Sequence, residues 1–210
     1  KAVDAALIIG IDLQTDHQVA GFFLKRQNWG GTQLITVSDQ PNGLCPYCAV
    51  SLQLSPGGYL DFVNGFLYAR NIHMQINQKY YEKKLAAVLE NTDMDANRLQ
   101  KAARLLADAV HPVIVIGGDF ATEDNYEALL QLVLFAQGEG IPILIIKGKA
   151  NSLAAAQLHY KVEPDSKTIE TALIALGDET PNDVLVERCK GIPSLIVYAS
   201  YPSALTERAD

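Results

Sequence analysis

The sequence predicts an α/β protein built on a mostly parallel sheet. Three observations predict this class. Short apolar runs rich in Ile, Val and Leu recur along the chain, and most of them are near-continuous rather than alternating. Glycine follows several of these runs, and segments with a helical period lie between them. This is the pattern of buried strands that are covered by helices on both faces of a sheet.

Seven apolar runs are the predicted strands. They span residues 5–11, 33–37, 48–54, 112–118, 141–148, 171–177 and 193–200. Because strands and helices alternate, we expect successive parallel strands to be joined by right-handed crossovers.

The segments between the runs predict amphipathic helices. Residues 94–110 carry an apolar stripe at helical spacing, with Asp93 or Asp95 available as the N-cap; the stripe consists of Leu99, Ala103, Leu106 and Val110. Residues 122–138 repeat this design and end at Gly138. Weaker helical patterns cover residues 58–70 and 76–91. The fold class is therefore α/β, with a mostly parallel doubly wound (Rossmann-like) sheet and helices on both faces.

The domain organisation admits two interpretations. The 210 residues can form one α/β fragment over 1–210, since single domains reach this size. Alternatively, the chain divides into 1–150 and 168–210, with 151–167 as a linker whose end is polar and contains proline. The sequence starts without Met and stops abruptly, so we expect it to be a piece of a longer protein.

Composition excludes several classes of function. The net charge of -7 and a pI near 5.1 argue against a nucleic-acid partner, which requires a clustered basic face. No apolar run reaches the roughly 18 residues that cross a bilayer, so we expect no direct membrane insertion. The predicted location is the cytoplasm, with attachment to the inner face of the membrane only through partner subunits.

Three cysteines fit free thiols in a reducing compartment. Cys45 and Cys48 form a CxxC motif, but the motif offers only two of the four ligands that a structural zinc site needs. It also does not begin a predicted helix, as a thioredoxin-type motif would. We interpret the pair as ordinary cysteines at a turn, and we predict no metal site.

Acidic residues follow most of the predicted strands. Ligands of open parallel sheets bind beyond the carboxyl ends of the strands, and four of these ends carry an aspartate: Asp12, Asp39, Asp119 and Asp178. A carboxylate accepts hydrogen bonds from a ribose diol or from the N–H pair of guanine, so an acidic rim suits a nucleoside. The competing interpretation is that each aspartate caps a helix.

Motifs for other ligands are missing. No GxGxxG or P-loop spacing and no GxSxG motif is present, and the four histidines are scattered. We therefore predict no catalytic residue. His17 is the one histidine that we retain as a candidate, because it begins the first helix beside Asp12.

Three stretches carry a resemblance to a known family. "IIGIDLQTDHQVAGFFLKR" resembles a Gly-x-Asn-Pro loop before a helix, with Gly10 and His17 matching and Asp12 replacing the Asn. "LITVSDQPNG" resembles an Asp-Pro-Arg turn through Asp39. "LQLSPGGYLDFVNGFLYA" resembles a Pro-Gly-Thr-Asp motif through Gly57, with Asp61 displaced by two positions. In this order the motifs resemble the molybdopterin oxidoreductase family, in particular the large subunits of formate dehydrogenase and of NADH-quinone oxidoreductase.

The resemblance implies a fragment of an electron-transport oxidoreductase that surrounds the guanosine side of a molybdopterin guanine dinucleotide, or a structural remnant of that site. The implied cofactor-binding residues are Gly10, Asp12, His17, Asp39, Gly57, Asp61 and Asp178. The iron–sulfur clusters and the molybdenum or tungsten centre would lie outside this fragment. The implied partners are the rest of its own chain and other subunits of a redox complex. Because several motif positions depart from the family, we favour the remnant.

A second resemblance defines the alternative. Residues 105–144 resemble the helix–strand–helix–strand unit in the central domain of thiamine-diphosphate-dependent enzymes. That unit is a general way to pack a crossover on a parallel sheet.

Overall fold

The computed structural model describes residues 2–15, 17–146, 169–177, 180–181 and 183–210. The chain forms two compact units, Lys1–Leu153 and Ala154–Asp210, which are described separately below. The predicted linker, 151–167, lies outside the described residues, so the subdivision stays a prediction.

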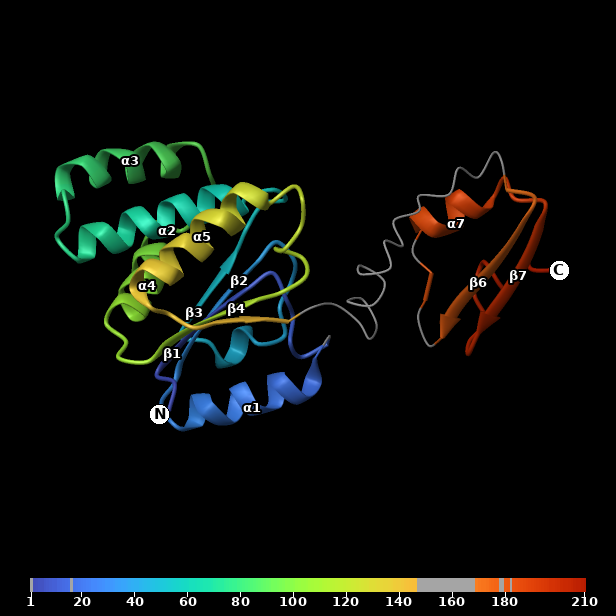
Figure 1. The fold of residues 1–210 in the computed structure, drawn as a ribbon, viewed down its shortest axis with the longest axis horizontal. Coiled ribbons are helices and arrows are strands. Elements are labelled where there is room, and N and C mark those ends of the chain that lie inside the picture. The colour runs from blue at the N-terminus through green and yellow to red at the C-terminus, as the bar shows by residue number, and fades with distance from the viewer. Residues whose placement is uncertain (1, 16, 147–168, 178–179, 182) are drawn as a thin grey trace. The chain divides into compact units, whose positions relative to one another are not determined.

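The first unit is built on a five-stranded parallel sheet (Figure 1). Its strands are β1 (Ala5–Ile9), β2 (Gln33–Ser38), β3 (Val50–Gln53), β4 (Pro112–Ile116) and β5 (Ile143–Ile145). The strand order is β3-β2-β1-β4-β5, and every neighbouring pair is parallel. This order equals the first five strands of the doubly wound nucleotide-binding sheet. The predicted fold class is confirmed.

Helices cover both faces of this sheet. They are α1 (Gln18–Trp29), the short 3₁₀ helix η1 (Cys45–Tyr47), α2 (Tyr59–His73), α3 (Gln78–Glu90), α4 (Ala96–Ala107) and α5 (Tyr126–Glu139). Figure 1 shows α1 on one side of the sheet and α2, α4 and α5 on the other, with α3 packed outside α2. Two helical layers therefore enclose the central strands.

The central strand β1 shows why the apolar runs are continuous. All five of its residues are at most 1% exposed. Leu7 and Ile9 belong to the larger core under α2, α4 and α5, whereas Ala6 and Ile8 belong to the smaller core under α1. Alternate side chains point to opposite faces of a strand, so burial on both faces requires an apolar residue at every position.

The start of α4 agrees with the prediction, but its end does not. Asp95, one of the two predicted caps, accepts hydrogen bonds from the backbone N–H groups of Asn97 (2.9 Å) and Arg98 (3.1 Å). Because α4 ends at Ala107, Val110 lies beyond it and is 75% exposed; its place in the buried stripe was wrong.

Helix α5 also ends later than predicted. It runs to Glu139 and stops at Gly140, which has a left-handed backbone (φ 67°), rather than at Gly138.

The second unit contains β6 (Thr171–Gly177), α7 (Asp183–Cys189) and β7 (Ser194–Ala199). The two strands are parallel, and one face of the pair packs in a small core around Cys189, Leu195 and Leu205. Other large hydrophobic side chains of the two strands are exposed: Leu173, Ile196 and Tyr198.

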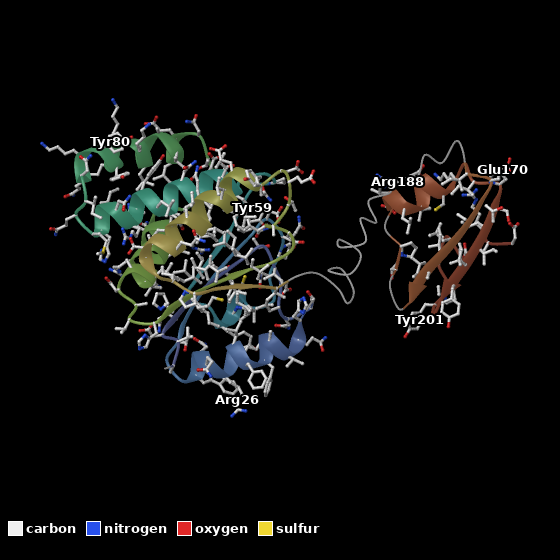
Figure 2. The ribbon with its side chains drawn as sticks, in the orientation of Figure 1. Arg26, Tyr59, Tyr80, Glu170, Arg188 and Tyr201 are labelled. Carbon is white, nitrogen blue, oxygen red and sulfur yellow. The ribbon has the colours of Figure 1, made fainter. Side chains whose placement is uncertain are left out.

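Figure 2 shows the side chains of both units, with Arg26 on the outer side of α1; Tyr59, also labelled, is the first residue of α2. In the portion of the chain that the structure describes, no helix is both long and apolar enough to cross a membrane.

Candidate functional site at the strand exits

The exits of β1 and β4 mark the point where the sheet changes direction. From β1 the chain continues through α1 to β2, and from β4 it continues through α5 to β5 on the opposite side. In doubly wound sheets this switch point is the place where a ligand crevice opens. Gly10 and Gly117 are the first residues after the two strands.

The backbones of the two exits lie in direct contact. Gly10 has φ +64°, and a Cβ there would lie 2.4 Å from the backbone nitrogen of Phe120. A Cβ on Gly117 would lie 2.2 Å from the carbonyl oxygen of Gly10. The N–H of Asp119 donates to that same oxygen at 3.1 Å. Gly10 is therefore needed for the close backbone contact, and its cofactor-binding role stays a prediction.

Two aromatic side chains fill the space beyond the glycines. Tyr59 is 1% exposed and Phe120 is fully buried, and their ring centroids lie 5.2 Å apart. Tyr59 comes from the start of α2, and Phe120 from the loop after β4. Both rings belong to the larger core, and Phe120 packs directly against Gly10.

Asp39 pairs with the polar end of Tyr59. The Tyr59 hydroxyl donates to Asp39 Oδ1 at 3.1 Å and accepts from the Asp39 N–H at 3.4 Å. Burial raises the pKa of Tyr59 far above its usual value, and the carboxylates of Asp39 and Asp119 raise it further. The phenol therefore stays protonated and acts as a hydrogen-bond donor. Asp39 is held at the switch point, as its place after β2 predicts.

Asp12 has a different set of partners. Its Oδ1 accepts the Gln14 N–H at 2.9 Å, and its Oδ2 accepts the Gly43 N–H at 3.0 Å. Asn42 supports the same connection by donating its side-chain amide to the carbonyl of Ile11 at 2.8 Å. Asp12 therefore fastens the loop after β1 to the loop after β2.

The other predicted residues lie in separate places. His17 is the half-buried N-cap residue of α1 and makes no side-chain capping bond. Gly57 (φ +79°) and Asp61 lie at the start of α2, beside a cavity of about 200 Å³ that also borders the loop between α3 and α4. Asp178 lies outside the described residues. Their cofactor-binding roles stay predictions.

The carboxylates of Asp12 and Asp39 are engaged within the protein. A guanosine held by Asp12 and Asp39 would need their carboxylate oxygens as acceptors. Both Asp12 oxygens and one Asp39 oxygen already accept hydrogen bonds from the protein, and Phe120 fills the space beyond Gly10. Sequence reasoning missed Tyr59 and Phe120 because their packing against each other depends on the tertiary fold, and no motif signals it.

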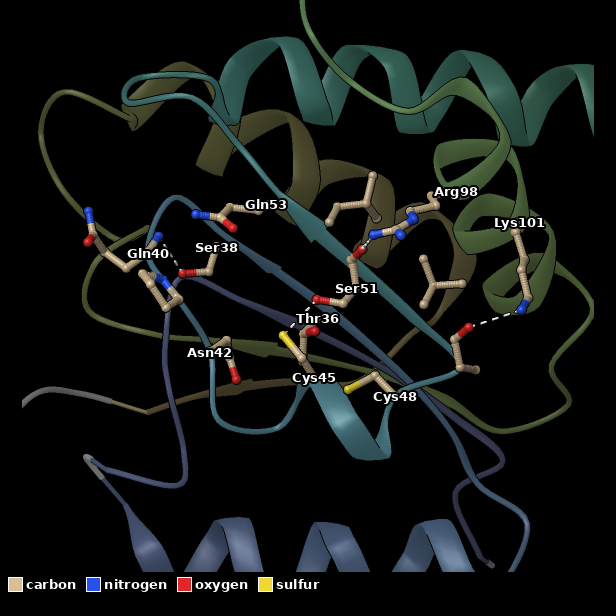
Figure 3. Close-up of a pocket in the computed structure, with 14 residues that line it drawn as sticks. Thr36, Ser38, Gln40, Asn42, Cys45, Cys48, Ser51, Gln53, Arg98 and Lys101 are labelled. Atoms are coloured by element: carbon tan, nitrogen blue, oxygen red, sulfur yellow. Dashed lines mark hydrogen bonds between the residues drawn. The ribbon is translucent and has the colours of Figure 1, made fainter.

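A second cavity runs along the outer edge of β3 (Figure 3). Its volume is about 630 Å³. It is bordered by β2, by β3, by the η1 segment with Cys45 and Cys48, and by α4. Its polar and charged lining residues are Thr36, Ser38, Gln40, Asn42, Ser51, Gln53, Arg98 and Lys101. Among the residues that the structure describes, no group of three or more His, Cys, Asp or Glu could hold a metal ion.

Comparison with known proteins gives structural neighbours only. No protein-family model and no curated protein sequence matches the chain. The chain is similar to a portion of the acetylene hydratase of Pelobacter acetylenicus, at 22% identity and a TM-score of 0.46, over 54% of this chain and 18% of that one.

It is also similar to a chain of the formyltransferase/hydrolase complex of Methylorubrum extorquens, solved with methylofuran, at 14% identity and a TM-score of 0.49. That match covers 94% of this chain and 57% of the other. This chain therefore spans under a fifth of the first protein and little more than half of the second. These values establish neither a family nor a function for it.

Proposed function

We propose that this chain belongs to the large subunit of a molybdopterin-family oxidoreductase, and that its switch point is a structural remnant of a guanosine site. The filling of that point by Tyr59 and Phe120 is the observation that carries the proposal. A working cofactor site keeps a crevice open at the switch point. On this proposal, the packing of Tyr59 against Phe120 takes the place of the ligand.

The hydrogen bonds of the acidic residues support the same role. Asp12 joins two loops, and Asp39 pairs with Tyr59, so both carboxylates stabilise the exits of β1 and β2. The departures from the family motifs at these positions agree with a site that retains its fold without its ligand. On this proposal the chain contributes no catalytic residue, and the redox centres belong to the rest of the protein or to partner subunits.

The surface of α1 supports a role in assembly. Four of its large apolar side chains are more than half exposed: Val19, Phe22, Phe23 and Trp29. Clustered exposed apolar side chains are characteristic of surfaces that contact another protein. The proposed partners are the rest of its own chain and other subunits of the complex.

Equilibrium dialysis with GDP and GMP tests the proposal. We expect no saturable binding to the parent chain, even at millimolar nucleotide. The double variant Asp12→Asn with Asp39→Asn removes the two predicted acceptors, and the exposed Asp124→Asn is the matched control. Micromolar binding by the parent that is lost in the double variant but kept in the control would overturn the remnant and establish a working guanosine site. Binding that all three proteins share would also contradict it.

A further inference from the structure

The CxxC motif closes a single tight turn beside the β3 cavity. The N–H of Cys48 donates to the carbonyl oxygen of Cys45 at 3.2 Å. A turn closed in this way holds its first and fourth Cα atoms within about 7 Å, and side chains three apart on a 3₁₀ turn project on the same side. Disulfides join Cα atoms about 4.4–6.8 Å apart. The two cysteines are therefore placed within reach of an intramolecular disulfide.

Both thiols are partly exposed and border the cavity. Cys45 Sγ lies 2.9 Å from Ser51 Oγ, and Cys48 Sγ donates to the carbonyl of Leu44 at 3.2 Å. Figure 3 shows the two sulfur atoms beside Thr36. The Thr36 hydroxyl is buried and forms no hydrogen bond of good geometry. A third side chain that could complete a metal site is missing among the described residues, so the arrangement favours redox chemistry over zinc binding.

The charge of the cavity favours an anionic ligand. Arg98 and Lys101 lie three residues apart on α4 and border the cavity, and none of its lining residues is acidic, although the chain carries a net charge of -7. Arg98 donates to the carbonyl of Ser51 in β3 (3.2 Å) and pairs with Asp95 (3.4 Å), and Lys101 donates to the carbonyl of Ala49, just before β3 (3.0 Å). The volume of about 630 Å³ lies within the usual range of small-molecule sites.

We propose that Cys45 and Cys48 form a redox-active dithiol that exchanges with small disulfides bearing carboxylates, the class of glutathione disulfide, which bind beside Arg98 and Lys101. Cys45 attacks one sulfur of the small disulfide as a thiolate, so a mixed disulfide forms and the first small thiol leaves. Cys48 then attacks Cys45 Sγ, which forms the Cys45–Cys48 disulfide and releases the second small thiol. Two protons and two electrons pass from the protein to the small disulfide. The inference does not depend on the proposed function.

The environment of Cys48 supports this order of attack. Burial raises the pKa of Cys48 to about 11, although the nearby Thr36 hydroxyl opposes the increase, and the neighbouring Cys45 thiol adds to it. A thiol that is almost fully protonated at neutral pH attacks slowly. Cys48 is therefore the resolving thiol, which acts after the mixed disulfide has brought a sulfur next to it.

Incubation of the whole chain with glutathione disulfide, followed by intact mass and peptide mapping, tests the linkage. We expect a Cys45–Cys48 disulfide with Cys189 still free, since Cys189 is 3% exposed in the second unit. Cys48→Ser is expected to stop at a glutathione adduct on Cys45, and Cys45→Ser to react at least about tenfold more slowly than the parent. Oxidation that gives only adducts in the parent, or a Cys45→Ser variant as reactive as the parent, would overturn the proposal.

Disulfides of different charge test the role of the basic side chains. The measured quantity is the ratio of the reaction rate with glutathione disulfide, which is anionic, to the rate with cystamine, which is cationic. At low salt we expect this ratio to be about tenfold higher in the parent than in the Arg98→Gln with Lys101→Gln variant. Glutamine keeps a donor for each β3 carbonyl but removes the charge. The exposed pair Lys79→Gln with Lys83→Gln on α3 is the control, and it should leave the ratio unchanged. An identical ratio in all three proteins would overturn the assignment of the anionic class.

Discussion

The exits of β1 and β4 and the outer edge of β3 belong to one sheet but have opposite character. At the exits, glycine backbones touch and aromatic rings fill the space. At the β3 edge, a cavity of about 630 Å³ remains, with two thiols and the buried Thr36 hydroxyl on its lining. Asp39 and Thr36 are only three residues apart in the chain, yet Asp39 pairs with the buried Tyr59 whereas Thr36 lines the cavity beside β3. The β1 and β4 exits are thus closed by backbone contact and aromatic packing, whereas the two thiols lie at an edge of the sheet.

The largest effect is expected from Phe120→Ala. Removal of a fully buried ring leaves a cavity, and such changes cost about 3–5 kcal/mol of unfolding free energy. Urea unfolding, followed by circular dichroism, measures the loss. A change below about 1 kcal/mol would show that Phe120 does not fill the switch point, and it would remove the contrast between the two regions.

Gly117→Ala is expected to cost about 1–3 kcal/mol, because the new Cβ would overlap the Gly10 carbonyl and the Ile11 side chain. The control is Gly138→Ala in α5, where a Cβ meets no atom within 4 Å. There alanine should stabilise the helix by up to about 1 kcal/mol. Equal effects in the two variants would contradict the close contact of the β1 and β4 exits.

Tyr59→Phe tests the contact between the Tyr59 hydroxyl and Asp39 beside the β1 and β4 exits. Loss of the hydrogen bond to Asp39 should cost about 1 kcal/mol at neutral pH. The pKa of Tyr59 is raised in the folded protein, so folding favours the neutral phenol. That contribution is fully present below the ordinary tyrosine pKa of about 10 and is lost as the pH rises above it. The stability of the parent should therefore fall more steeply than that of Tyr59→Phe in alkaline solution, and parallel curves would refute the assignment.

The smallest effect on stability is expected at Cys48, where the test is reactivity. With a pKa of about 11, its alkylation by iodoacetamide should be slow at neutral pH and rise about tenfold per pH unit up to that value. Mass spectrometry of the Cys45→Ser variant follows Cys48 within the motif. A rate that levels off near pH 8 or 9 would indicate an ordinary exposed thiol, and the cavity beside β3 would then lack a resolving cysteine.

The strands were predictable from the sequence because burial on both faces demands unbroken apolar runs. Each of the seven predicted runs overlaps a strand, and Asp95 was one of two predicted caps of α4. The errors came where local pattern and tertiary contact diverge. Val110 has the correct spacing for the apolar stripe, but the helix ends three residues before it. Gly138 was a plausible stop, yet the left-handed conformation that ends α5 belongs to Gly140.

The candidate site was less accessible to sequence reasoning. The acids follow the strands as expected, but position after a strand does not determine what a carboxylate contacts. Asp12 accepts the N–H of Gly43, 31 residues away, and Asp39 accepts the hydroxyl of Tyr59, 20 residues away. The turn at Cys45 agrees with the sequence prediction, whereas no sequence pattern signals that Arg98 and Lys101 of α4 border the same cavity.

The hydrogen bonds from Arg98 and Lys101 to β3 have a further consequence for how the protein behaves in solution. Among the described strands, β3 ends the sheet on its side. The carbonyls of Ser51 in β3 and of Ala49 just before it already accept hydrogen bonds from these two side chains. A foreign β-strand would have to displace both cations before it could add to the sheet there. This border of the sheet is therefore partly protected against pairing with a strand of another molecule.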